Sequence, residues 1–108
     1  MLAQLIENDI RALLRAPSSG AQAPTVAALE ETLTSGYARA MALEAEQARL
    51  QRQIADVVVE LADREVELPD PKLRRLAQDL KAADEELTQL RLLLGSLRRR
   101  TDETRSAA

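Results

Sequence analysis

The side chains that could do chemistry in this chain are carboxylates and guanidinium groups, because the sequence contains no histidine and no cysteine. Two acidic clusters stand out, one at Glu44 and Glu46 and one at residues 84–86 beside Lys81. Paired carboxylates can act as general acid and base when a pocket positions them. Neither cluster has an imidazole or a metal-ligand partner at a suitable spacing, so we interpret both as solvated flanks of helices. The sequence therefore predicts no enzyme, no metal site and no cofactor.

A basic run at residues 98–100 is the other group of charges that could hold a ligand. Arg98 and Arg99, together with Arg91, are candidate contacts for an anion. The same run also fits the C-terminal end of a helix, where cations complement the helix dipole. The net charge of −3 and the single aromatic residue, Tyr37, do not favour nucleic-acid binding.

Composition indicates what kind of fold carries these charges. The chain has 108 residues, 45% of them hydrophobic, but only 1% aromatic. Leucine and alanine without large rings build helix–helix seams more readily than a conventional globular core. No apolar run approaches the roughly 20 residues of a membrane span, and no secretory signal is evident. We expect a cytoplasmic all-α protein.

The N-terminal segment, residues 1–16, is predicted to be a short amphipathic helix, with its apolar residues three and four apart. These residues are Leu2, Leu5, Ile6, Ile10, Leu13 and Leu14. Residues 17–24 contain two prolines, one glycine and two serines, a composition typical of a linker.

Residues 25–100 carry two long runs of apolar residues at alternating spacings of three and four, the heptad pattern of coiled coils. The first run begins after Thr25, a good N-cap residue, and is expected to end near Arg64. The second begins at Asp70 and Pro71, an N-cap followed by proline at the first helical position. The predicted seam residues are Leu50, Ile54, Val57, Leu61, Leu73, Leu76, Leu80, Leu87, Leu90, Leu94 and Leu97. Residues 101–108 are small and polar, and we expect them to form a disordered tail.

The two heptad runs are predicted to pair as an antiparallel coiled-coil hairpin, because the link between them is short. Charge supports this pairing: residues 25–68 hold nine acids and four bases, net −5, whereas residues 70–100 hold five acids and eight bases, net +3. The expected layer at the closed end places Ile54, Val57 and Leu61 opposite Leu73, Leu76 and Leu80.

Two helices alone rarely bury enough apolar surface to be stable. We therefore expect the N-terminal helix to dock near Val26, Leu29 and Leu33, and two chains to associate as a homodimer in a helical bundle. The candidate partner interface consists of Gly36, Tyr37, Ala40, Gln47, Leu92 and Leu93.

Gln47 has two open interpretations. It either specifies the register from within the seam or turns outward to solvent.

Asp84-x3-Thr88-x2-Arg91 resembles the first three positions of the acidic-x3-Ser-x2-Arg-x3-Gln-x3-Asp motif of cyclic-di-GMP-dependent anti-sigma factors, whose sensor is an antiparallel helical hairpin. The present chain departs from that motif at Gly95 and Arg99. Our leading hypothesis is a non-enzymatic α-helical module that binds a protein partner, itself or another chain. The alternative, shaped by the resemblance, is a small regulator that sequesters a transcription factor and responds to a nucleotide.

Overall fold

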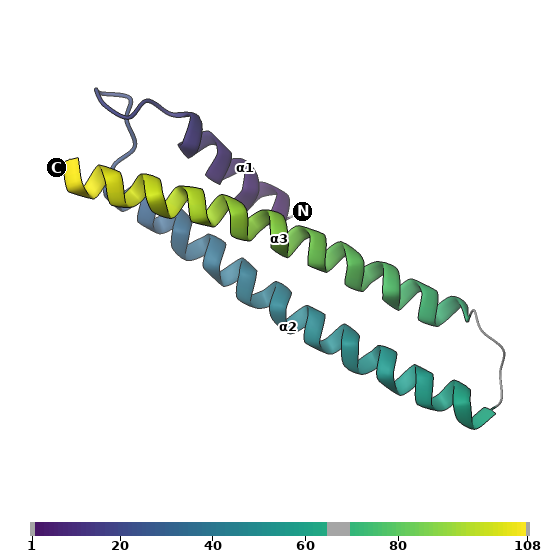
Figure 1. Ribbon diagram of the computed structural model, residues 1–108. Helices are drawn as coiled ribbons and strands as arrows, with labels where there is room; N and C mark the ends of the chain where they lie inside the picture. The colour runs from purple at the N-terminus through teal and green to yellow at the C-terminus, as the bar shows by residue number, and fades with distance from the viewer. Residues whose placement is uncertain (1, 65–69, 108) are drawn as a thin grey trace. The chain divides into compact units, whose positions relative to one another are not determined.

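The helices begin and end at the residues that local chemistry favours. A computed structural model describes residues 2–64 and 70–107, and within these residues the chain is all-α, with three helices and no strand. Helix α1 spans Leu2–Arg15, α2 spans Val26–Arg64 and α3 spans Pro71–Ala107 (Figure 1). In the part of the chain that is described, no helix is both long and apolar enough to cross a membrane.

Side-chain caps fix the starts of the two long helices. The Thr25 hydroxyl accepts a hydrogen bond from the Ala28 amide at 3.1 Å, and the Asp70 carboxylate accepts one from the Leu73 amide at 3.1 Å. Each bond satisfies a backbone donor that has no partner inside its own helix. Both predicted N-caps are therefore confirmed.

The segment between α1 and α2 is not helical and turns at Gly20. Gly20 has a φ of 93°, in the left-handed region, and its carbonyl accepts a hydrogen bond from the Ala23 amide at 3.2 Å. Residues with a side chain rarely adopt this backbone conformation, so glycine is the suitable residue here.

The expected disordered tail at residues 101–108 is wrong for residues 101–107, because α3 continues through Ala107. Thr101 and Thr104 extend the heptad spacing beyond Leu97, and Thr101 is buried. The Thr101 hydroxyl donates to the Leu97 carbonyl and the Thr104 hydroxyl to the Arg100 carbonyl, both at 2.8 Å. These bonds to the preceding turn let a polar side chain occupy a seam position without an unsatisfied hydroxyl. Ala108 lies outside the described residues.

The described chain divides into two compact units, and each of the two long helices contributes one segment to each unit. Unit 1 combines the described residues up to Met41 with those from Thr88 onward, and unit 2 runs from Ala42 to Leu87.

Unit 1 has a core to which all three helices contribute. Its fully or nearly fully buried apolar residues are Ile10, Leu29, Ala40, Leu90, Leu94 and Leu97. In this unit α2 and α3 run antiparallel, since Glu30 pairs with Arg105 whereas Gly36 lies beside Leu94. Helix α1 lies against both of them (Figure 1), and the Ile10 side chain is completely buried.

At Gly36, α2 packs closely against side chains of α3 and α1. A Cβ atom built at this position would overlap the Leu94 side chain and lie 3.6 Å from the Ile10 Cδ1 atom. Glycine in the middle of a helix costs about 1 kcal/mol relative to alanine. The contact with Leu94 and Ile10 provides a packing reason for it here.

Unit 2 contains only α2 and α3 segments among its described residues, and its seam is less completely covered. Residues on the two helices again meet in antiparallel order, with Gln47 beside Asp84 and Val57 beside Leu76. Leu43, Leu50, Val57, Ala83 and Leu87 are buried, but five of the predicted seam residues are only half-buried. These five are Ile54, Leu61, Leu73, Leu76 and Leu80. Of the link predicted between the helices, residues 65–69 lie outside the described residues.

Candidate interaction surface

The residues predicted to form a partner interface are divided between buried and exposed positions in unit 1. Gly36 and Ala40 are buried within the chain, so they offer no surface to a partner in this structure. Tyr37 and Leu92 are exposed at 41% and 65%, and Leu93 is half-buried. The structure therefore separates Gly36 and Ala40 from the exposed members of the predicted surface.

Gln47 lies in unit 2 and is half-buried. Its amide nitrogen donates a hydrogen bond to an Asp84 carboxylate oxygen at 3.2 Å. The side chain is thus engaged with the neighbouring helix, which agrees better with a role in fixing the register than with free solvation. A polar pair of this kind favours one alignment of two apolar seams, because a shifted alignment leaves the amide without its partner.

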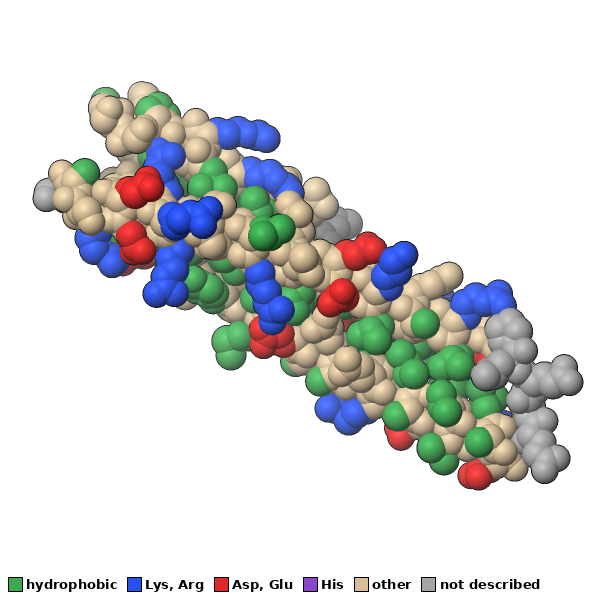
Figure 2. All heavy atoms as spheres, in the orientation of Figure 1, with side chains coloured by type: hydrophobic (Ala, Val, Ile, Leu, Met, Phe, Trp, Pro, Cys, Tyr) green, Lys and Arg blue, Asp and Glu red, His purple; other side chains and the backbone are tan. Residues whose placement is uncertain are grey.

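A groove of about 350 Å³ begins at this polar pair and runs between α2 and α3 of unit 2. Its lining residues are Gln47, Gln51, Ile54, Ala77, Leu80, Lys81 and Asp84. The apolar floor consists of Ile54, Ala77 and Leu80, and the polar residues lie toward one end. Figure 2 shows apolar side chains gathered over the part of the surface that belongs to unit 2.

The apolar surface continues from the groove onto α2. Val58 and Val59 are exposed at 48% and 61%, and Ala55 and Ala62 are also exposed. Contiguous exposed apolar residues of this kind indicate contact with a protein or another apolar partner.

The other flank of unit 2 has a different character. A second hollow of about 220 Å³ is lined by Gln53, Asp56, Val57, Glu60, Lys72 and Leu76. Most of these side chains are polar or charged. An apolar helix placed there would remove charges from water, which is costly unless each is paired. The exposed apolar surface of unit 2 is therefore on the groove side.

The three candidate anion contacts lie on α3 in unit 1. Arg91, Arg98 and Arg99 are exposed, and the Arg99 guanidinium donates to the Ser96 hydroxyl at 3.3 Å.

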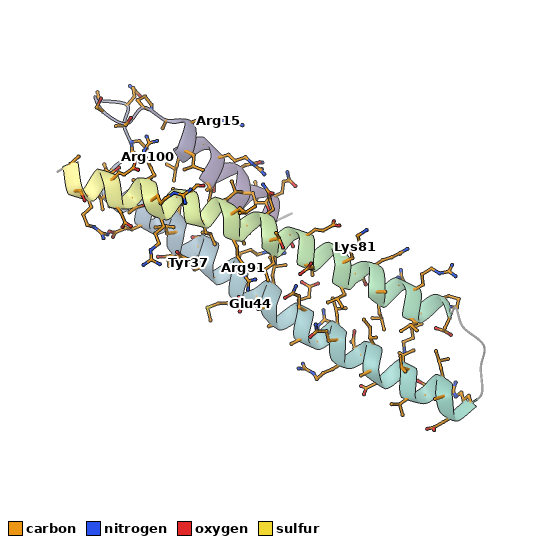
Figure 3. All side chains as sticks on the ribbon, viewed as in Figure 1. Arg15, Tyr37, Glu44, Lys81, Arg91 and Arg100 are labelled. Carbon is orange, nitrogen blue, oxygen red and sulfur yellow. The ribbon has the colours of Figure 1, made fainter. Side chains whose placement is uncertain are left out.

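Sequence reasoning treated Arg100 as a helix-end charge and missed its structural role. Its guanidinium donates to the carbonyl oxygens of Leu14, Ala16 and Pro17 at 3.3, 2.7 and 2.9 Å. Carbonyls at a helix C-terminus have no partner in their own helix, and the planar, forked guanidinium can reach several of them. Figure 3 shows Arg100 on α3 beside the end of α1. Arg100 thus fastens α1 within unit 1.

Of the acidic residues in the two clusters, Glu44, Asp84 and Glu85 are exposed, and Glu46 and Glu86 are half-buried. Lys81 and Glu85 form an ion pair at 3.9 Å, with the two side chains 78% and 67% exposed. Across residues 2–64 and 70–107, no three acidic side chains gather in a way that could hold a metal ion.

Comparisons of this chain with models of protein families, with curated proteins and with solved structures found no match.

Proposed function

We propose that the chain is a non-enzymatic, α-helical protein–protein interaction module that binds through the apolar side of unit 2. In this proposal α2 and α3 form an antiparallel coiled-coil hairpin, with α1 packed on one part of it. The observation that carries the proposal is the exposure of Val58 and Val59 next to an apolar groove floored by Ile54 and Leu80. Apolar surface left open on a short two-helix segment is stabilised when further helices cover it.

The shape and chemistry of this surface favour a helical partner. Residues Ile54, Val58 and Leu61 recur at spacings of three and four, which presents a straight apolar row along α2. An amphipathic helix that lies beside such a row can bury its own apolar stripe, as in helix-in-groove recognition. The neighbouring Gln47–Asp84 pair at the end of the groove supplies polar groups that select an orientation.

A photoreactive side chain placed at position 58 tests this function. We expect the Val58 variant of the full chain to form covalent products with its partner, identified by mass spectrometry, when illuminated in native cell extract. The matched control places the same group at Gln53, an exposed residue on the charged flank of the same helix. Products at position 58 but not at position 53 support the proposal. Equal yields at both positions, or none at position 58, would exclude this surface.

The regulatory hypothesis, sequestration of a transcription factor, is a version of the same proposal with a particular occupant. It differs in requiring that a nucleotide changes the binding equilibrium between this chain and the transcription factor. A nucleotide that binds the folded chain raises the melting temperature of the chain. A thermal-shift titration with cyclic dinucleotides is the direct test. An unchanged midpoint at saturating ligand would remove the nucleotide from the proposal.

A further inference from the structure

Helix α2 carries a second heptad row within unit 2, in addition to the seam that faces α3, and four of its five members are apolar. We call it the outer stripe; its members are Ala48, Gln51, Ala55, Val58 and Ala62. Their spacings alternate three, four, three and four, as in a coiled-coil seam. All but the half-buried Ala48 are exposed, and the exposed Val59 adjoins the stripe. A heptad row on the uncovered side of a helix indicates a second helix–helix contact.

The charges beside the outer stripe are arranged in a self-complementary way. Arg52 lies near one end and Asp63 near the other, and both are exposed. Eleven residues separate them, which is about three helical turns, so the two side chains lie on the same side of α2. A parallel copy of this helix would bring Arg52 against Arg52 and Asp63 against Asp63. An antiparallel copy instead brings each Arg52 beside the Asp63 of its partner.

Side-chain size fits nearly the same symmetry. In an antiparallel pair centred between Ala55 and Val58, one residue from the midpoint of Arg52 and Asp63, each Ala55 faces the Val58 of the second copy. Small residues opposite large ones allow two helices to interlock without voids. Glu60 lies on the other side of α2 and stays in water, whereas Asp56, seven residues before Asp63, lies on the same side of the helix as Asp63.

We propose that the occupant of this surface is a second copy of the same chain, bound through the outer stripe with the two α2 helices antiparallel. The inference rests on the function proposed above and names its partner. A two-fold interface uses the same patch on both copies and must therefore be its own complement. The outer stripe meets this requirement in charge and in size, and the resulting arrangement gives unit 2 a four-helix environment that covers Ile54 and Leu61.

Charge exchange in the full-length chain tests the proposal. In sedimentation equilibrium we expect the wild type to reach twice the 11.9 kDa mass of one chain. Arg52→Asp and Asp63→Arg should each weaken dimerisation about tenfold, because two favourable pairs at the rim of the interface become repulsive. An equimolar mixture of the two variants should restore dimers, because every acid at positions 52 and 63 of one chain then meets an arginine of the other. The double variant should dimerise alone.

Controls separate this contact from a folding defect and from other interfaces. Gln53→Asp adds a charge on the other flank and should leave the dimerisation constant unchanged, and circular dichroism of dilute samples should show equal helicity for all variants. A wild type that stays at 11.9 kDa at every concentration, or a dimer indifferent to the exchange, overturns the inference. If such a monomer still forms cross-links from Val58 to a different protein, the interaction module stands and the self-association alone fails. Without any cross-link from Val58, both proposals fall.

Discussion

Units 1 and 2 are built from the same two long helices and the same heptad repeat, yet they bury their seams to different extents. In unit 1 the seam residues Leu29, Leu94 and Leu97 are at most 3% exposed. In unit 2 the equivalent residues Leu76 and Leu80 are half-exposed. The repeat alone therefore does not determine burial.

The difference has two local causes. Unit 1 has a third helix, α1, whose Ile10 is inserted beside Gly36, and a guanidinium, Arg100, that binds the carbonyls at the end of α1. The positions of unit 2 that correspond to Arg100 and Leu93 in the repeat of α3 are Asp79 and Glu86. These acids share the heptad position of Lys72, on the charged flank of unit 2, so the side that α1 covers in unit 1 does not suit an apolar third helix in unit 2. The comparison teaches that residues flanking the seam determine which part of a two-helix segment is covered by a third helix of the same chain.

The largest effect is expected from a leucine-to-alanine substitution made at the same heptad position in each unit, with the free energy of unfolding compared between the two variants. Leu97→Ala should lower the free energy of unfolding by about 3 kcal/mol, because Leu97 is fully buried and a cavity would remain. Leu76→Ala should cost about 1 kcal/mol, since part of that side chain already contacts water. Urea titrations of dilute samples measure both. Equal losses would show that the seam of unit 2 is as fully covered as that of unit 1.

The second prediction concerns two glycines of unit 1, at which substitution by alanine should change the free energy of unfolding in opposite directions. Gly36→Ala should destabilise the protein by about 1 to 2 kcal/mol, because the new methyl group meets the buried Leu94 side chain. Gly95→Ala should stabilise it by about 0.5 to 1 kcal/mol, since nothing lies within 4 Å of that position and alanine favours the helix. Thermal melts of the two variants are the measurement. A gain from Gly36→Ala would mean that α3 does not approach α2 closely there.

Much of this organisation follows from local patterns in the sequence. Thr25 and Asp70 predict the starts of α2 and α3, and the alternating spacing predicts which side of each helix is covered: all seam positions are buried or half-buried. Such features depend on neighbours within a few residues, so a single sequence reveals them.

The remaining features depend on contacts between distant residues. Arg100 looks like any helix-end cation until the end of α1 is known to lie beside it, 84 residues earlier in the chain. Thr101 looks like the start of a polar tail, although its hydroxyl can bond the preceding turn and its methyl group can pack. The predicted partner interface includes Gly36 and Ala40, and packing inside unit 1 covers these two residues. The exposed Val58 and Val59 of unit 2 belong to an apolar run at positions 57–59, which exceeds what one seam can cover.

The third prediction isolates the attachment of α1. Arg100→Lys keeps the charge but replaces a forked donor, which binds the Leu14 carbonyl through one nitrogen and the Ala16 and Pro17 carbonyls through the other, with a single ammonium nitrogen. Loss of about 1 kcal/mol of docking energy should raise amide exchange at Ile10 and Leu13 about fivefold, without a change in unit 2. Arg99→Lys is the matched control, because Arg99 bonds Ser96 on its own helix. Unchanged exchange in both variants would show that Ile10 alone holds α1.

The smallest expected effect comes from the ion pair between Glu30 and Arg105, which joins α2 and α3 in unit 1 with both side chains about half-exposed. Surface pairs of this kind contribute roughly 0.2 to 1 kcal/mol, because water already solvates both charges well. In a double-mutant cycle with Glu30→Gln and Arg105→Gln, we expect a coupling energy within that range that declines from 0.05 to 0.5 M salt. Such a value would mean that packing around Ile10, Gly36 and Leu94, and not charge, accounts for the better coverage of unit 1. A coupling above about 2 kcal/mol that resists salt would instead make this pair a main cause of the difference between the units.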